Sequence, residues 1–293
     1  MKIRIIACGV FEPYIKAMAP EPGNSSECLF LDAGLHEFPD RLRQAVQEEI
    51  DRISREKEDY DAIVLFYGLC GRGTAELTAR EIPVFIPRVH DCIALFMGSD
   101  AAYKKEFAKN PGTFYHTLGW LAKKINPNEM AAVDLYRNYN DIGWDMHPEF
   151  ERLGKEYGEG NAEYILKFAA SWQKNYSRGA YIDMGFSEDK YAEETRVMCR
   201  AFGWKYERIK GDMAYLRRLF RGAASDRIFV LPPFSASKAS GDDRIFNAVA
   251  AGEKEHSFYE TETVLYDEGA EKSKKGIGLG IDAGGTYTDA VIF

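Results

Sequence analysis

The feature that most constrains the fold is a short, uninterrupted apolar segment, "DAIVLFYG", at residues 61–68. Strands buried on one face alternate apolar and polar residues, whereas strands at the centre of a parallel sheet are buried on both faces and are continuously apolar. Helices must then cover both faces of the sheet. The segment therefore predicts a central parallel strand, and it makes an α/β fold the expectation for the chain.

Short apolar runs and helix signals alternate along most of the sequence. We expect strands at residues 3–8, 27–34, 61–68, 82–88, 179–186 and 226–233, with "GTFYHT" (112–117) and "WKYERIKG" (204–211) as further candidates, and helices at about 38–60, 188–202 and 212–221. This order predicts a mostly parallel, doubly wound sheet with a helical insertion around residues 99–177. Two Rossmann-like halves of related design remain an open alternative.

The composition changes after Phe234, and this change suggests where the first domain ends. We predict an α/β domain over residues 1–240, a linker region over 241–275 and a separate segment over 276–293. In the changed region, "SASKASGDDR" indicates a loop, "RIFNAVAAGEKEHSF" a short helix and "YDEGAEKSKKG" a charged linker.

Charge and cysteine usage exclude several classes of protein. A net charge of -8 argues against broad binding of nucleic-acid backbones, and no apolar run reaches membrane-spanning length. The N-terminus lacks the long apolar region of a secretory leader. The five cysteines are odd in number, widely spaced and free of any CxxC pair, so we expect no disulfide framework and a cytoplasmic protein.

The last stretch of the sequence, "GIGLGIDAGGTYTDAVIF", has the form of a phosphate-binding turn. A strand ends in Asp282, which can hold a hydrated cation; the turn Gly284–Gly285 lets backbone N–H groups approach phosphate, and the hydroxyls of Thr286 and Thr288 add donors. The segment resembles the start of hydantoinase/oxoprolinase-type actin-like ATPase domains. That resemblance implies that the rest of an ATPase domain is missing and that this chain alone does not hydrolyse ATP. A Gly-rich hairpin turn is the simpler alternative.

Three cysteines follow three predicted strands. Cys8 ends the first strand, Cys70 follows the third, and Cys92 follows the fourth. Because the carboxyl ends of parallel strands meet in one crevice, these thiols are candidates for a shared metal site, with His90 as a further ligand. Soft thiolates suit zinc, which we favour slightly, or a 4Fe–4S cluster. The alternative is that they are small buried side chains.

Three other residues with reactive side chains have a structural interpretation. Cys28 lies inside a predicted strand and Cys199 inside a predicted helix, so both are expected to pack as small apolar groups. His36, in "LHEFP", is expected to cap or pack at the entry of a helix.

The segment "GLCGRGTAEL" carries a second signal, for an anion. Its glycines Gly68, Gly71 and Gly73 follow a strand and are expected to precede a short helix, with Arg72 between them. Such a turn can present backbone N–H groups to an anion, and Arg88 could pair with a carboxylate or phosphate. A tight turn without a ligand is equally compatible with the pattern.

Several strings together resemble a known family. They are "IIAC", "LHEFPDRL", "FYGLCGRG", "IPRVHDCIALFMGS", "NPGTFYHTLGW", "FGWKYERIKGDMAYLRRLF" and "FVLPPF", and they run from residue 3 to about residue 234. The family is the one numbered sixteen thirty-eight among domains of unknown function. The resemblance implies a site around Cys8, Cys70, His90 and Cys92, and an association with corrinoid-dependent methyl transfer. "FVLPPF" lacks the glycine expected after the two prolines.

Three functions are therefore open. The first is a metal-bearing enzyme or accessory factor of methyl or one-carbon metabolism, acting on a small molecule and working with a corrinoid protein or methyltransferase. The second is an iron–sulfur redox protein served by an ATP-driven partner domain. The third is a non-catalytic domain that binds a small molecule or anion. The pattern leaves open whether the protein is an enzyme.

Overall fold

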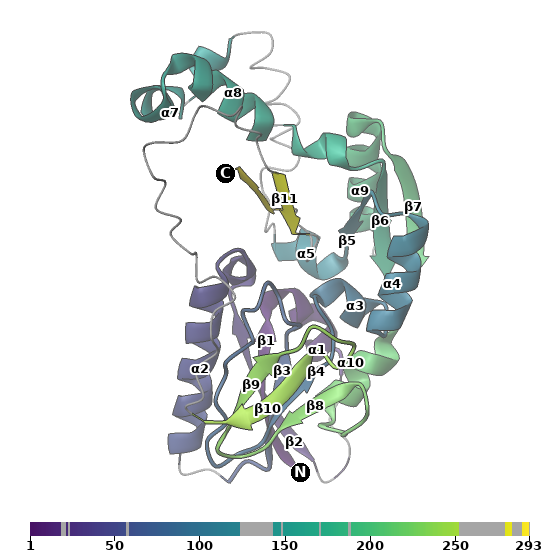
Figure 1. Cartoon of the computed structure of the whole chain (residues 1–293). Coiled ribbons are helices and arrows are strands. Elements are labelled where there is room, and N and C mark those ends of the chain that lie inside the picture. Colours follow the sequence, from purple (N-terminus) through teal and green to yellow (C-terminus); the bar gives the residue numbers. More distant parts are fainter. Residues whose placement is uncertain are drawn as a thin grey trace, which may run out of the picture.

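The fold is described from a computed structural model of the chain (Figure 1). The structure describes residues 1–18, 22, 24–56, 59–123, 143–147, 149–169, 171–186, 189–251, 279–282 and 289–292.

Five strands form the first sheet, in the order β2-β1-β3-β4-β8. They are β1 (Lys2–Cys8), β2 (Ser25–Leu31), β3 (Ala62–Phe66), β4 (Val84–Pro87) and β8 (Ile228–Leu231). The first four in this order are parallel, and β8 pairs antiparallel with β4. Every residue of β3 is buried. The apolar segment at 61–68 is thus the central strand of a mostly parallel sheet, and the α/β prediction is confirmed.

Helices cover both sides of this sheet. They are η1 (Gly9–Phe11), α1 (Glu12–Lys16), η2 (Ala33–Glu37), α2 (Pro39–Arg55), α3 (Cys92–Phe96) and α10 (Met213–Phe220). In Figure 1, α2 and α10 lie on opposite sides of the strands. Leu42, Val46, Ile50 and Ile53 form the buried face of α2. Among the helices of the described residues, none combines the length and the apolar character that a membrane crossing requires.

A second, separate sheet follows in the order β5-β6-β7, and all of its strands are parallel. It consists of β5 (Thr113–His116), β6 (Arg178–Asp183) and β7 (Lys205–Lys210), accompanied by α4 (Asp100–Lys109), α5 (Leu118–Lys123), η3 (Trp144–Met146), α7 (Phe150–Tyr157), α8 (Glu159–Ala169), η4 (Trp172–Asn175) and α9 (Asp189–Phe202). The described chain therefore has a mostly parallel five-stranded sheet and a parallel three-stranded sheet, each accompanied by helices.

Residues 99–177 are not only the helical insertion that the sequence suggested. They include β5, which pairs with β6 and thereby belongs to the second sheet. All four residues of β5 are buried, and β5 lies within the strand candidate "GTFYHT" (112–117), which is thereby confirmed.

The two sheets share one apolar core. Tyr115, Ala180 and Ile182 of the second sheet belong to the same buried cluster as the residues of β1 and β3. Where the halves meet, α5 packs on η1 and α1, and the amide of Gly119 donates to the hydroxyl of Tyr14 at 3.2 Å. Figure 1 shows α3 and α5 between the two sheets. Packing at this junction fixes how the halves sit relative to one another.

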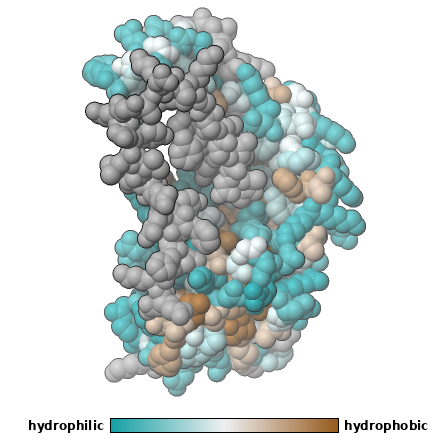
Figure 2. Space-filling model, viewed as in Figure 1, coloured by the Kyte–Doolittle hydropathy of each residue, from teal (hydrophilic) through white to brown (hydrophobic). Residues whose placement is uncertain are grey.

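The region after Phe234 is a hairpin where the sequence indicated a loop and a helix. β9 (Ser235–Ala239) pairs antiparallel with β10 (Phe246–Ala250). The small residues of β9 have low strand propensity. The chain before the hairpin nevertheless provides hydrogen-bond partners for one of them. Ser237 accepts a hydrogen bond from the amide of Leu77 and donates one to the carbonyl of Thr74. Hydrophobic residues on the face in Figure 2 gather over this hairpin.

The nucleotide-motif prediction falls largely outside the described residues. β11 (Leu279–Asp282) pairs antiparallel with β12 (Asp289–Ile292), so a strand does end at Asp282. Gly284, Gly285, Thr286 and Thr288 lie outside the described part of the chain.

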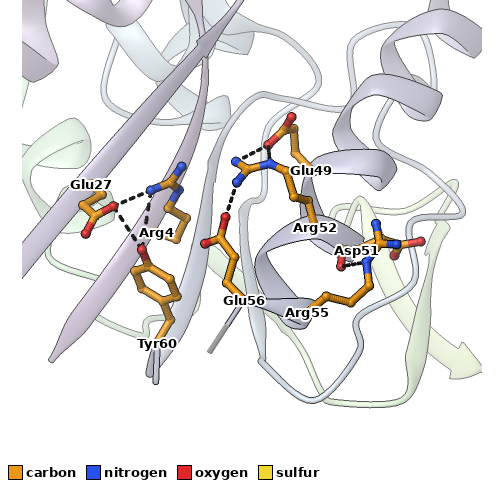
Figure 3. A network of polar contacts seen from close by, with 8 residues as sticks. All are labelled: Arg4, Glu27, Glu49, Asp51, Arg52, Arg55, Glu56 and Tyr60. Atoms are coloured by element: carbon orange, nitrogen blue, oxygen red, sulfur yellow. Dashed lines mark hydrogen bonds and ion pairs between the residues drawn. The ribbon is translucent and has the colours of Figure 1, made fainter. Parts of the chain in front are cut away.

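The amino ends of the first sheet's strands carry ion pairs (Figure 3). Arg4 of β1 binds Glu27 of β2, and the hydroxyl of Tyr60, which precedes β3, donates to the same carboxylate at 3.0 Å. On α2, Arg52 binds Glu49 and Glu56. These charged side chains at the amino edge are paired with one another. A binding site that needs polar side chains for a ligand is therefore more readily formed at the carboxyl edge.

A buried cation joins the parts of the second half. Arg178, at the start of β6, is 3% exposed. Its guanidinium donates to Thr113 of β5 at 2.8 Å, to Glu207 of β7 at 2.8 Å and to Glu106 of α4 at 2.5 Å. Hydrogen bonding from Arg178 lowers the pKa of Glu207. This cluster links the three strands of the second sheet to α4.

We expect Arg178→Met to lower the free energy of unfolding by about 2–3 kcal/mol, because it removes a buried cation and leaves the partly exposed carboxylates of Glu106 and Glu207 without their partner. Since the pKa of Glu207 is lowered in the fold, the stabilising pairing is present above pH 4.5 and is lost as the pH falls through the lowered pKa. The difference in the free energy of unfolding between wild type and variant should therefore become smaller in acid. Urea denaturation at several pH values measures this difference. Arg152→Met, which removes exposed ion pairs on α7, is the control and should change little. Equal effects of the two substitutions would contradict the prediction.

Candidate functional site

Three thiols lie at the carboxyl edge of the first sheet. Cys8 is the last residue of β1, Cys70 follows β3, and Cys92 is the first residue of α3 after β4. The strand order places β1, β3 and β4 side by side. The chain after β3 also pairs with the chain after β4, because the amide of Cys70 donates to the carbonyl of His90 at 2.8 Å. We call Cys8, Cys70 and Cys92 the three-thiol cluster.

The three thiols lie within electrostatic range of one another. Burial raises the pKa of Cys8 to about 11. Burial also raises the pKa of Cys70, and the nearby Cys8 adds to this shift. The pKa of Cys92 is raised well above its ordinary value by burial, then by Asp91, Cys70 and Cys8. Each thiol of the cluster is therefore close to another, and all three are protonated at neutral pH.

Two aromatic side chains border the three-thiol cluster. Tyr67 is 2% exposed, and its hydroxyl interacts with the thiol of Cys8. Trp120, on α5 of the second half, interacts through its side chain with the thiol of Cys92. The Tyr67 hydroxyl and the Trp120 indole N–H are buried and make no hydrogen bond of standard geometry within the described residues. The cluster thus has polar groups from both halves of the chain around it.

The backbone at Cys70 is strained. Cys70, Gly71 and Arg72 have φ values of 47°, 60° and 71°, in the left-handed region that non-glycine residues rarely adopt. Each non-glycine residue there costs energy that the surroundings must offset, and such residues cluster at functional sites. The surrounding structure therefore holds Cys70 in this conformation at the edge of the sheet.

No helix follows this turn, although the anion-site prediction expected one. Residues 70–76 form turns, since three successive left-handed residues cannot begin a right-handed helix. Close packing accounts for two of the glycines. A Cβ at Gly68 would lie 2.9 Å from the backbone of Asp91, and one at Gly73 would lie 2.6 Å from the side chain of Leu42.

The two arginines of the anion-site prediction have different surroundings. Arg88 donates to the carbonyls of Arg244 and Phe246, and it stacks over the ring of Phe229 at 5.1 Å. It therefore ties the hairpin to the sheet. Arg72 is exposed. The role of either arginine in anion binding stays a prediction.

His90 is exposed. It lies within electrostatic range of Asp91 and of Asp243 near the hairpin, and its role as a metal ligand stays a prediction. Asp91 caps α3, and its Oδ1 accepts from the amides of Ile93 at 2.9 Å and Ala94 at 3.2 Å. Burial raises the pKa of Asp91 to about 6. The capping role could have been found in the sequence, since Asp directly before an apolar run is a helix-start signal.

His36 borders the same edge of the sheet, in η2. Its Nδ1 lies 2.6 Å from the carbonyl oxygen of Ala33, and its ring meets that of Trp120 edge-on at 5.1 Å between centroids. The sequence treated it as a packing residue because nothing in the local pattern links it to the distant cysteines.

The remaining cysteines lie outside the three-thiol cluster, and the packing prediction is confirmed for Cys199 but wrong for Cys28. Cys28 is exposed in β2, and Cys199 is buried in α9, where its thiol donates to the carbonyl of Gly179 at 3.8 Å. All five cysteines are free thiols. As their side chains are placed, no group of three or more His, Cys, Asp or Glu residues in the described part of the chain is arranged to hold a metal ion.

Comparison with known proteins gives one match. A family model described as "Protein of unknown function (DUF1638)" matches residues 30–220. No curated protein and no solved structure matches the chain. The matched range contains Cys70 and Cys92, and Cys8 precedes it.

Proposed function

The chain belongs to the DUF1638 family of proteins of unknown function, and from its own residues we propose that it binds a thiophilic metal ion through Cys8, Cys70 and Cys92. The observation that supports this function is the convergence of three thiols from three strand ends, held in part by the strained turn at Cys70. The carboxyl edge of a parallel sheet is where α/β proteins bind ligands.

The chemistry of the donors favours a metal over unassisted thiol catalysis. Because burial raises their pKa values, the three thiols are poor nucleophiles on their own. A soft cation deprotonates the thiols that coordinate it, and it thereby converts an inert cluster into a ligand set. The side chains must turn toward the ion on binding, since they are not yet arranged around one point. Their small size makes this rearrangement local.

Zinc is the metal we favour. When bound, it supplies Lewis acidity and lowers the pKa of a coordinated thiol or water. The chain would then be an enzyme or accessory factor acting on a small molecule. The family resemblance directs this proposal to corrinoid-dependent methyl or one-carbon metabolism, with a corrinoid protein or methyltransferase as the partner and the reducing cytoplasm as the compartment.

An iron–sulfur cluster is the second candidate. Three cysteine ligands at three strand ends are also compatible with a 4Fe–4S cluster that has one open iron. The chain would then be a redox protein and not a methyl-transfer factor. Colour separates the two, because zinc has no visible absorbance.

The test is elemental analysis together with a visible spectrum on full-length protein purified without oxygen. We expect about one zinc per chain in the wild type and a loss of most of it in Cys70→Ser. Cys28→Ser is the matched control, since it removes an exposed thiol outside the three-thiol cluster and should retain the metal.

If the wild type instead contains iron, with broad absorbance near 400 nm that is lost in Cys70→Ser, the bound group is an iron–sulfur cluster and not zinc. Absence of metal in the wild type, or equal metal in all three proteins, would overturn the proposed function. A domain that binds a small molecule or anion would then be the remaining alternative.

A further inference from the structure

A pocket of about 160 Å³ lies where the two halves of the chain meet. Met18 lines it from the segment after α1, Phe186 lines it from the segment after β6, and α10 forms another side. Since α10 follows β7, the pocket lies beyond the carboxyl ends of β6 and β7, which are neighbouring parallel strands. α/β proteins bind ligands in crevices at this edge of a sheet.

Most of the pocket's lining is apolar. Met18, Phe186 and Met213 are partly buried and pack against the main core, and Phe220 is 5% exposed. The ring of Phe186 meets that of Tyr14 edge-on, with the centroids 5.3 Å apart, and this contact supports the wall of the pocket. Apolar cavities of about 150 Å³ bind benzene. The pocket therefore has room for an apolar group of that size.

Two arginines of α10 complete the lining. Arg217 and Arg221 are exposed and lie one helical turn apart, so their positive charges are on the same face of the helix and repel one another. In the part of the chain that the structure describes, the guanidinium of Arg217 makes no ion pair, whereas that of Arg178 binds two carboxylates. An anion bound at Arg217 and Arg221 would offset the repulsion, because guanidinium groups form paired hydrogen bonds with carboxylates and phosphates.

We propose that this pocket, which we call the α10 pocket, binds a small organic anion. The acid group of the ligand, a carboxylate or a phosphate monoester, contacts Arg217 and Arg221. Its apolar body, no larger than about a benzene ring, lies against the two methionines and Phe186. The α10 pocket shares no residue with the three-thiol cluster and needs no metal. It gives the chain a second binding site, at the carboxyl edge of the second sheet.

The probes for this site are benzoate, phenyl phosphate and benzyl alcohol, which share a benzene ring and differ in the acid group. They are titrated into full-length protein whose methionine methyl groups are labelled with ¹³C. Met18 and Met213 line the α10 pocket, whereas Met198 is buried elsewhere, in α9, and serves as the internal control. Methionine-to-leucine variants assign the three signals. The shift of each signal with probe concentration gives the dissociation constant.

Two variants of α10 test the role of charge. Arg217→Gln and Arg218→Gln each remove one exposed positive charge from the last turn of the helix, so they change its interaction with the helix dipole alike. Only Arg217 lines the pocket. Circular dichroism verifies that both variants are folded.

We expect the two acids to shift the signals of Met18 and Met213 but not that of Met198, with dissociation constants of about 1 mM or below. Arg217→Gln should weaken their binding at least about tenfold, and Arg218→Gln should leave it unchanged. Binding of only one acid with this pattern would support the site and restrict its ligands to that acid class.

Three results would refute the inference. The first is that neither acid shifts the signals of Met18 and Met213. The second is that wild type and Arg217→Gln bind the acids equally well. The third is that benzyl alcohol binds as tightly as the acids, since the pocket would then recognise the ring and not the charge.

Discussion

Replacing Gly119 by alanine should be among the most destabilising small changes in this chain. A Cβ at this position would lie 1.8 Å from the carbonyl oxygen of Val10 and 2.7 Å from its carbonyl carbon, both backbone atoms that cannot turn aside. The clash would push α5 away from η1 and weaken the bond from Gly119 to Tyr14. We expect a loss of about 3 kcal/mol in the free energy of unfolding. Guanidinium denaturation measures it.

The control is another glycine-to-alanine change inside a helix. Gly160 lies in α8, and a Cβ there would meet nothing within 4 Å. Gly160→Ala should be neutral or stabilising by up to about 1 kcal/mol, because alanine favours the helix. Opposite signs for the same chemical change would show that the junction tolerates no side chain at Gly119. A Gly119→Ala variant as stable as the wild type would mean that the two halves are not packed as described.

Phe96→Ala should cost about 3–5 kcal/mol, the usual range for removing a fully buried aromatic ring. Phe96 ends α3 and is 0% exposed. Its ring stacks on Phe11 at 4.8 Å and meets Tyr14 edge-on at 5.3 Å. The cavity would lie where the first sheet meets α5, and it should also loosen α3, which begins at Cys92. Denaturation and near-ultraviolet circular dichroism measure the two effects.

Phe107→Ala is the matched control for this prediction. Phe107 lies on α4 and is 38% exposed, so its ring is only partly withdrawn from water. Its removal should cost much less than that of Phe96, since little apolar area returns to solvent. Similar losses in both variants would show that the ring of Phe96 does not hold the junction together.

The local parts of the fold were predictable because the way an element is buried determines the pattern of apolar residues in its sequence. β3 is apolar throughout since both of its faces are covered, and α2 carries Leu42, Val46, Ile50 and Ile53 on one face since only that face packs. The hairpin that was misassigned has no such pattern. β9 has the sequence SASKA, and its Ser237 hydrogen-bonds to the backbone of Leu77 and Thr74, far away in the chain.

The candidate site was likewise predictable only in part. That Cys8, Cys70 and Cys92 meet followed from strand order, because any open parallel sheet brings its carboxyl ends to one edge. Where the histidines lie did not follow. His90 is two residues from Cys92 in the sequence but has an exposed side chain, whereas the ring of His36, far away in the sequence, contacts Trp120, which interacts with Cys92.

The sequence by itself determined the fold class, the central strand, the main helices and the edge at which the thiols gather. These depend on local periodicity and on the general rules of parallel sheets. Only the tertiary structure decided that there are two sheets, that Trp120 of the second half borders a thiol of the first, and that the ring of His36 meets that of Trp120. Those contacts depend on how loops and rotamers pack across residues far apart in the chain, and no local pattern encodes that packing.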